Sequence, residues 1–126
     1  MDTAKGLVAV YGSLRKGLHN HSLLERADFL GTDVIAGFKM YSLGGFPFIT
    51  HDDATYDDRI FIEVYSVNPN EMRRLDMLEG YPSFYNRELV QTQYGQAWIY
   101  FIDNEVAGHD PVIDGDWFKY YTGRVA

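Results

Sequence analysis

The alternation of apolar and polar positions predicts a chain built mainly of β-strands. It is clearest over Arg59–Val67, where the apolar side chains at 60, 62 and 64 face one side of an extended segment. A short apolar run also predicts a first buried strand over Leu7–Leu14. Two further runs, 84–94 and 96–103, flank Gly95 and predict a hairpin.

Other segments are punctuated by glycine or carry weaker helical signals. Residues 29–50 mix short apolar pieces with glycines at 31, 37, 44 and 45, which predicts strand–turn–strand structure with bends or bulges. Residues 22–27 fit one or two helical turns with Ser22 as a possible N-cap. The aromatic-rich tail, 114–124, predicts a turn or a single helical turn packed on the body.

One helix is marked by signals at both ends. Asn68 suits the N-cap, Pro69 the first helical position and Glu71 the third, where its side chain completes a capping box. Gly80 ends the helix, and Pro82 follows it. Together these elements predict an α+β fold, a small mixed β-barrel-like sheet with a few packed helices, formed by one domain over residues 1–126.

The composition of the chain argues against several kinds of partner and functional site. The formal net charge is −7 with scattered lysines and arginines, which disfavours a nucleic-acid partner. The chain has no cysteine, so disulfides, thiolate metal sites and cysteine nucleophiles are excluded. The acidic run 51–58 has the character of a solvated loop, and we expect no metal site. No apolar stretch nears twenty residues, so we expect no membrane partner and a cytoplasmic location.

Glu79 lies where a carboxylate is least expected. At about 100° per residue, it falls between Met72 and Leu75 on the helical wheel, inside the apolar stripe. It also occupies the last turn, where the helix dipole disfavours an anion. Burial and the dipole would both raise its pKa, which suits proton transfer near neutral pH. The alternatives are that Glu79 frays into solvent or pairs with Arg87.

The loop YGSLRKG, Tyr11–Gly17, follows the first apolar run and has three possible functions. It lacks the spacing of a phosphate-binding loop. A nucleophilic Ser13 would need a base and an oxyanion site that the sequence does not identify. The third possibility is a backbone nest, in which the N–H groups of Ser13 and Leu14 bind a carboxylate or oxyanion and Arg15 or Lys16 adds charge. An ordinary solvated turn is the alternative.

Three motifs in order resemble one known family. YGSLRKG near the start, LEGYPSFYNR (residues 78–87) in the middle and GDWFKYY (residues 115–121) near the end resemble the γ-glutamylcyclotransferase-like family. The match is nearest to its γ-glutamylamine cyclotransferase and avirulence-induced-gene-like branch. The resemblance implies a β-barrel-like fold and cyclisation of a γ-glutamyl amine or amide to 5-oxoproline with release of the amine. It also implies that no cofactor is used.

The resemblance implies roles for particular residues. Tyr11, Gly12, Ser13 and Leu14 would hold the α-carboxylate of the glutamyl group, with Arg15 adding charge. Glu79 would be the catalytic acid–base group. Tyr85 and Arg87 are candidates to line the pocket, and Tyr85 is equally well read as core. Trp117, Tyr120 and Tyr121 are candidates to close one side of the site, with packing favoured for Trp117. The glycine-rich segment 42–47 is a candidate lid.

Several questions stay open at the level of sequence. The motifs do not choose the leaving amine or decide between a monomer and a homodimer. A non-catalytic small-molecule-binding or regulatory module on the same fold is the main alternative function. A protein–protein interaction domain with an aromatic surface is a third.

Overall fold

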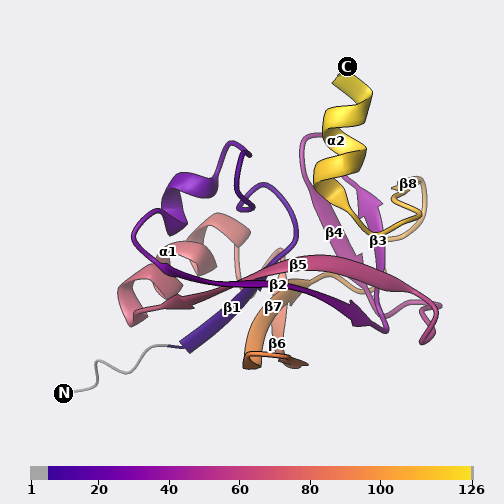
Figure 1. Ribbon diagram of the computed structural model, residues 1–126. Coiled ribbons are helices and arrows are strands. Elements are labelled where there is room, and N and C mark those ends of the chain that lie inside the picture. The colour runs from indigo at the N-terminus through magenta and orange to yellow at the C-terminus, as the bar shows by residue number, and fades with distance from the viewer. Residues whose placement is uncertain (1–5, 126) are drawn as a thin grey trace.

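The computed structural model describes residues 6–125 as two β-sheets with helices packed around them (Figure 1). The larger sheet has the strand order β2-β5-β1-β7-β6 and the smaller one the order β4-β3-β8. The strands are β1 (Gly6–Val10), β2 (Asp28–Ala36), β3 (Lys39–Ser42), β4 (Pro47–Thr50), β5 (Arg59–Val67), β6 (Asn86–Thr92), β7 (Gly95–Phe101) and β8 (Asp110–Pro111). The helices are the 3₁₀ helix η1 (His21–Leu24), α1 (Pro69–Glu79) and α2 (Trp117–Val125).

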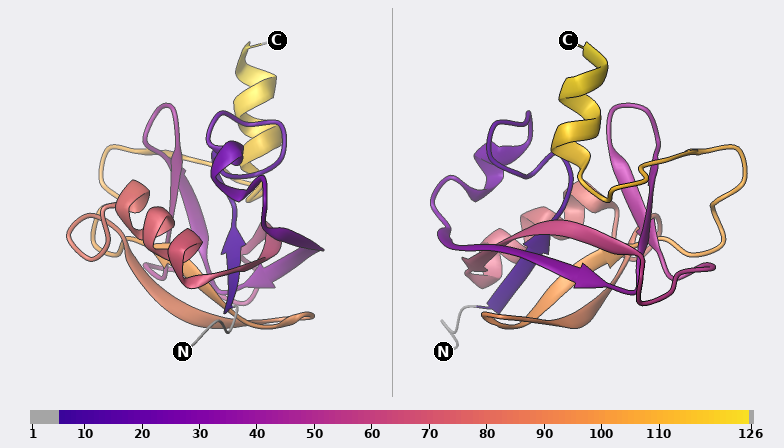
Figure 2. Two further views of the ribbon diagram at one scale, coloured as in Figure 1. Left: turned by 90° about the vertical axis from the view of Figure 1, so that its left-hand side faces the viewer. Right: turned by 45° about the vertical axis from the view of Figure 1, so that its right-hand side comes forward.

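Strand β5 lies between β2 and β1, antiparallel to both, and its bounds match the predicted strand. Its two faces serve two different cores. Ile60, Ile62 and Val64 belong to one buried cluster, whereas Tyr65 and Val67 belong to the other. The predicted hairpin is confirmed as β6 and β7, which pair in register up to Thr92 and Gly95. In Figures 1 and 2, α1 and the loop that carries η1 lie on the same side of the larger sheet.

Helix α1 begins and ends at the residues that the sequence predicts. The Asn68 side chain accepts from the Glu71 N–H at 2.7 Å, and the Glu71 carboxylate accepts from the Asn68 N–H at 2.8 Å. Gly80 follows in the left-handed conformation, with φ of 65°, and ends the helix because a residue with a Cβ rarely adopts it. The last helical residue, Glu79, is thereby fixed at the end of a rigid element.

The expected barrel does not close within residues 6–125. The edge strands β2 and β6 form no ladder with each other. Instead, side chains of the β6–β7 turn reach back to β2, where Gln93 Nε2 and the Tyr94 hydroxyl both donate to the Thr32 carbonyl. The two sheets are joined on another side, where the Ile102 N–H donates to the Ile49 carbonyl at 2.9 Å. Side-chain bonds therefore occupy the position where strand pairing would close a barrel.

Three local predictions were wrong. The first strand ends at Val10 rather than Leu14, because the chain turns and the Arg15 N–H donates to the Gly12 carbonyl. Ser22 is not an N-cap, since η1 begins at His21 and has no side-chain cap bond. The tail forms a nine-residue helix, α2, rather than a single turn. Trp117 anchors that helix, buried and stacked on Tyr120 and Tyr121.

Candidate functional site

A cavity of about 200 Å³ lies where β1 runs into the Tyr11–Gly17 loop and faces the end of α1. Its lining includes six of the residues that the sequence singled out: Tyr11, Gly12, Ser13, Leu14, Glu79 and Tyr85. The β3–β4 turn contributes Phe46 and Pro47 to the same cavity. Segments far apart in the sequence therefore meet here, with the loop on one side and the last turn of α1 on the other.

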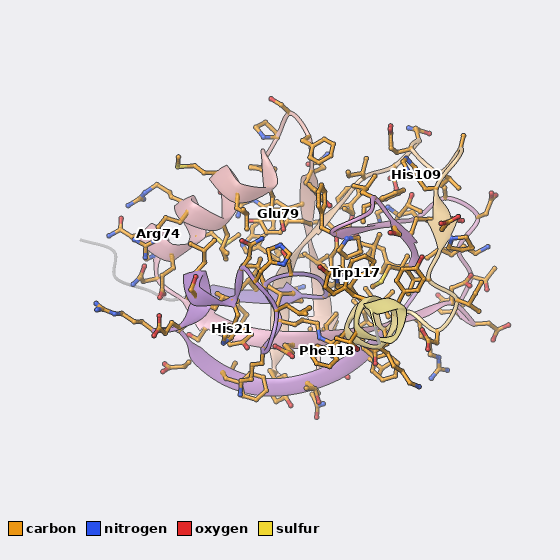
Figure 3. The ribbon with its side chains drawn as sticks, turned by 90° about the horizontal axis from the view of Figure 1, so that it is seen from above. His21, Arg74, Glu79, His109, Trp117 and Phe118 are labelled. Carbon is orange, nitrogen blue, oxygen red and sulfur yellow. The ribbon has the colours of Figure 1, made fainter. Side chains whose placement is uncertain are left out.

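Glu79 is the one charged residue among those that line the cavity within residues 6–125. Figure 3 shows it on the side of α1 that faces the body of the protein. Burial raises the pKa of its carboxyl from 4.5 to about 7. Its carboxylate makes no hydrogen bond or ion pair with any described residue, so it is available to a ligand. Neither alternative from the sequence holds, because Glu79 is not frayed into solvent and does not pair with Arg87.

Arg87 is held instead by Asp76 and by two aromatic rings. Its Nε lies 3.6 Å from Asp76 Oδ1, and its guanidinium lies 4.6 Å from the Tyr81 ring centre and 4.4 Å from that of Trp98. Arg87 does not line the cavity. These contacts hold the Arg87 guanidinium in place, so Arg87 does not act as a counter-ion for Glu79.

Three consecutive residues of the loop line the cavity and, within residues 6–125, have unpaired backbone N–H groups. Those of Gly12, Ser13 and Leu14 have no hydrogen-bond acceptor in the part of the chain that the structure describes. The next two N–H groups are used, because Arg15 donates to the Gly12 carbonyl and Lys16 donates to Glu63. Unpaired successive donors at the wall of a cavity suit the binding of a carboxylate or an oxyanion.

Asn20 and His21 hold the loop in place. Asn20 Nδ2 donates to Ser13 Oγ at 2.8 Å, and the Asn20 N–H donates to the Ser13 carbonyl at 2.9 Å. His21 Nδ1 lies 2.9 Å from the Leu14 carbonyl oxygen. The Ser13 hydroxyl is thus bonded to an amide and to no imidazole or carboxylate, so the structure supplies no general base for a nucleophilic serine.

Arg15 lies outside the residues that line the cavity. Its Nη1 donates to Asp116 Oδ1 at 2.8 Å, and its Nε lies 3.4 Å from Glu63 Oε2. The Tyr65 hydroxyl also donates to Glu63, at 2.9 Å. Arg15 therefore ties the loop to β5 and to the start of α2, and its charge is already compensated by two carboxylates.

Three tyrosines surround Glu79, and the sequence identified two of them. The Tyr11 hydroxyl donates to the Tyr100 carbonyl at 2.7 Å, and the Tyr85 hydroxyl donates to the Pro47 carbonyl at 2.6 Å. Burial, together with the nearby Glu79 charge, raises the pKa of both hydroxyls. Tyr100, whose hydroxyl donates to Asp76, also lines the cavity but was missed. No signal marks it, since it is one aromatic residue in an aromatic-rich strand.

Two further predictions from the sequence concerned aromatic residues closing one side of the site and a glycine-rich lid. Trp117, Tyr120 and Tyr121 do not line this cavity, and Trp117 is a packing residue as favoured. The segment 42–47 is the tight turn between β3 and β4, closed by a bond from the Leu43 N–H to the Phe46 carbonyl at 2.8 Å. Its last two residues form part of the cavity wall.

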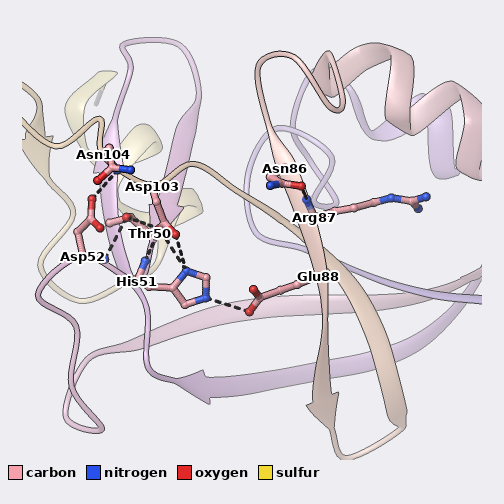
Figure 4. A network of polar contacts seen from close by, with 8 residues as sticks. All are labelled: Thr50, His51, Asp52, Asn86, Arg87, Glu88, Asp103 and Asn104. Atoms are coloured by element: carbon pink, nitrogen blue, oxygen red, sulfur yellow. Dashed lines mark hydrogen bonds and ion pairs between the residues drawn. The ribbon is translucent and has the colours of Figure 1, made fainter.

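A second polar cluster, away from the cavity, joins β6 to the residues that follow β4 and β7 (Figure 4). His51, just after β4, places Nε2 2.9 Å from Glu88 of β6 and Nδ1 3.0 Å from Asp103 beyond β7. Arg87 points away from this cluster in Figure 4. No group of three potential metal ligands among the described residues is arranged to hold an ion. None of the helices within residues 6–125 is long and apolar enough to cross a membrane.

We expect the His51 cluster to stabilise the fold most in mildly acidic solution. Partial burial lowers the pKa of His51, but the hydrogen bonds to Glu88 and Asp103 outweigh it and raise that pKa above 6.5. A raised histidine pKa gives stability that is complete below 6.5 and is lost as pH rises through the folded value. The Tm difference between wild type and His51→Gln should therefore be larger at pH 5.5 than at pH 8.5. An equal difference at both values would contradict this role, and His19→Gln is the control.

Known proteins similar to this chain share one family description. The family model described as "Gamma-glutamyl cyclotransferase, AIG2-like" matches residues 8–119. A gamma-glutamylcyclotransferase family protein of Escherichia coli, YtfP, is 34% identical over 110 residues, which cover 87% of this chain and 94% of that protein.

Solved structures give the same result for the fold. The crystal structure of an uncharacterized protein from Pyrococcus horikoshii superposes with a TM-score of 0.80 and 28% identity, covering 95% of this chain and 96% of that one. The solution structure of the Escherichia coli YtfP protein superposes with a TM-score of 0.71 and 32% identity, covering 91% and 98%. These proteins share the fold of this chain over most of its length.

Proposed function

Since this chain belongs to the AIG2-like family of gamma-glutamyl cyclotransferases, we propose that it converts a γ-glutamyl amine or amide into 5-oxoproline and a free amine. Glu79 is the general acid–base group, and the N–H groups of Gly12, Ser13 and Leu14 hold the substrate's α-carboxylate. The reaction requires no cofactor in this mechanism, because the attacking amine and the carbonyl belong to one molecule.

The chemistry divides between positioning and proton transfer. The loop holds the glutamyl group folded, so that its α-amine lies against its own γ-carbonyl carbon. Ionised Glu79 takes a proton from the α-amine as the new C–N bond forms and the carbonyl oxygen gains negative charge. The protonated Glu79 then gives the proton to the departing nitrogen, and the original C–N bond breaks as the carbonyl re-forms. Atoms and charge balance, and Glu79 returns to its ionised state.

One observation supports this proposal above the others. A carboxylate without a counter-ion, with a pKa of about 7, shares a small cavity with three unpaired N–H donors. A binding module for a small acid would need the donors but not the carboxylate, which repels an anionic ligand. An acid–base group must gain and lose a proton near neutral pH, and this environment provides that property.

The test is release of 5-oxoproline from a panel of γ-glutamyl amines and amides, followed by mass spectrometry with the wild-type protein. Release that depends on protein concentration supports the proposal. If no member of the panel is cyclised while the same compounds bind, the chain acts as a binding or regulatory module. If none binds, the cavity is not a γ-glutamyl site.

We expect Ser13→Ala to be mild. The substitution removes the hydrogen bond from Asn20 Nδ2, with a cost of about 1 kcal/mol in the free energy of unfolding. The Ser13 N–H remains, and so does the bond from the Asn20 N–H to the Ser13 carbonyl. The rate of 5-oxoproline release should fall by less than about tenfold. A loss of about a thousandfold or more would instead show that the hydroxyl takes part in the chemistry.

A further inference from the structure

Among the residues of 6–125 that line the cavity, there are N–H donors for one carboxylate and no cation for a second. Glu79 is its one charged lining residue within residues 6–125. Both nearby guanidinium groups are already occupied, Arg15 by Glu63 and Asp116, and Arg87 by Asp76 and two aromatic rings. A second carboxylate on a ligand would therefore lie near the negative charge of Glu79 with no lining cation to compensate it.

Large apolar side chains from three segments of the chain line the cavity. Leu78, in the last turn of α1, and Phe84, just before β6, are 42% and 52% exposed, and Phe46 of the β3–β4 turn is 40% exposed. All three line the same cavity. Exposed apolar side chains gathered at a concave site indicate a ligand surface rather than a solvated one.

Local structure holds Phe84 in this position. Its N–H donates to the Gly80 carbonyl at 2.7 Å, and its ring meets the Tyr85 ring edge-on at 5.0 Å between centres. The Gly80 cap that ends α1 therefore also sets the position of this ring. Leu78 and Phe84 thus flank Glu79 in sequence and stand beside the carboxylate in the cavity wall.

The cavity is large enough to enclose only one part of the ligand. A cavity of about 200 Å³ is smaller than the 300–1,000 Å³ or so of a typical small-molecule site. The glutamyl group, which must reach both the loop and Glu79, fills the enclosed space. The departing amine then extends over the apolar side chains at the opening.

We infer that the leaving amine is an apolar primary amine, aromatic or branched aliphatic, and not an α-amino acid. This inference rests on the proposed function, and it specifies the substrate class of the same site. Phe46, Leu78 and Phe84 form the surface that receives the apolar group. The absence of a free cation among the lining residues discriminates against a carboxylate on the leaving group.

A pair of substrates that differ only in one carboxylate tests this inference. γ-Glutamylphenethylamine and γ-glutamylphenylalanine present the same ring, and only the second carries a carboxylate on the leaving amine. We expect kcat/KM for 5-oxoproline release to be at least about tenfold higher for the amine. Equal values, or a preference for the amino acid, would overturn the inference while leaving the proposed function intact.

A matched pair of variants tests whether the cavity wall at Leu78 distinguishes the two substrates. Leu78→Lys adds a cation at the cavity wall and should reduce the preference at least about threefold. Met77→Lys adds the same charge one residue earlier, at a side chain that is 81% exposed and does not line the cavity, and should leave the preference unchanged. Both substrates meet the same Glu79, so the ratio cancels any common effect on its pKa. An equal response of the two variants would contradict the assigned surface.

Binding separates failure of the inference from failure of the proposed function. If neither compound is cyclised, release from the wider panel of γ-glutamyl amines and amides decides the proposed function, and calorimetry with this pair decides the inference. Tighter binding of γ-glutamylphenethylamine would support the apolar surface. Equal affinity, or no binding of either compound, would overturn it.

Discussion

Replacing Glu79 with glutamine is expected to lower the rate of 5-oxoproline release by about 10²–10⁴-fold, the usual contribution of a general acid–base group. Glutamine keeps the size of the side chain but cannot accept and return the proton. In the wild type, the rate at saturating substrate should rise as pH increases through about 7, since Glu79 must be ionised to act as a base. The measurement is product formation between pH 5.5 and 8.5.

The same substitution should stabilise the protein at high pH. The folded-state pKa of Glu79 is raised from 4.5 to about 7, so the folded protein binds this proton more tightly than the unfolded chain does. Stability then falls as pH rises between those two values, and the full cost is present above 7. Allowing for partial exposure, that cost is roughly 1–3 kcal/mol, so Glu79→Gln should raise Tm at pH 8 by roughly 3–10 °C.

Glu25→Gln is the control, because it removes the same formal charge at an exposed position outside the cavity. It should retain the wild-type rate, with little change in Tm. The gain in Tm of Glu79→Gln should shrink as pH is lowered toward 4.5. Wild-type activity in Glu79→Gln would refute its role as the acid–base group, and a lower Tm at pH 8 would refute the unpaired, desolvated carboxylate.

Gly12→Ala is the second substitution with a large expected effect. A Cβ at position 12 would lie 2.8 Å from Pro47 Cδ and 2.9 Å from Pro47 Cγ, closer than carbon atoms can approach. The proline ring cannot rotate away, and its carbonyl accepts the Tyr85 hydroxyl bond. Either the loop or β4 must move, at a cost of about 1–3 kcal/mol in the free energy of unfolding.

Displacement of the loop also moves the three N–H donors, so we expect 5-oxoproline release to fall by about 10²-fold. Gly12→Val should be worse in both respects. Gly45→Ala is the matched control, because nothing lies within 4 Å of a Cβ there. Chemical denaturation measures the stability of each variant, and the release assay measures its activity. Unchanged stability and activity in Gly12→Ala would mean that Pro47 does not require glycine at this position.

Elements whose signals are local could be predicted from the sequence. Asn68 and Glu71 bond to each other across one helical turn, and Gly80 ends the helix through its own backbone conformation, so the bounds of α1 follow from a few adjacent residues. Strand β5 follows from its alternation in the same way. The position of Glu79 in an apolar stripe is also a local property, and it marked this carboxylate as a candidate while fraying or pairing with Arg87 stayed open.

The contacts between those elements could not be predicted from the sequence and are seen in the folded protein. The need for glycine at position 12 does not come from its own backbone, since its φ is not positive; it comes from the close approach of Pro47 of β4. Arg15 looked available for a ligand until Glu63 and Asp116 were found to bind it. The edges of the larger sheet are linked by side-chain bonds from Gln93 and Tyr94 to β2, with no strand pairing between β2 and β6.

The physical reason is the range of the interactions. Capping, turn formation and alternation act between residues a few positions apart, so their pattern is visible in the sequence. The desolvation of Glu79, the unpaired N–H groups of the loop and the occupied state of Arg15 and Arg87 depend on segments brought together by folding. The sequence therefore identified a suspect carboxylate and a suspect loop, and the packing of α1 against β1 and β4 made them two sides of one cavity.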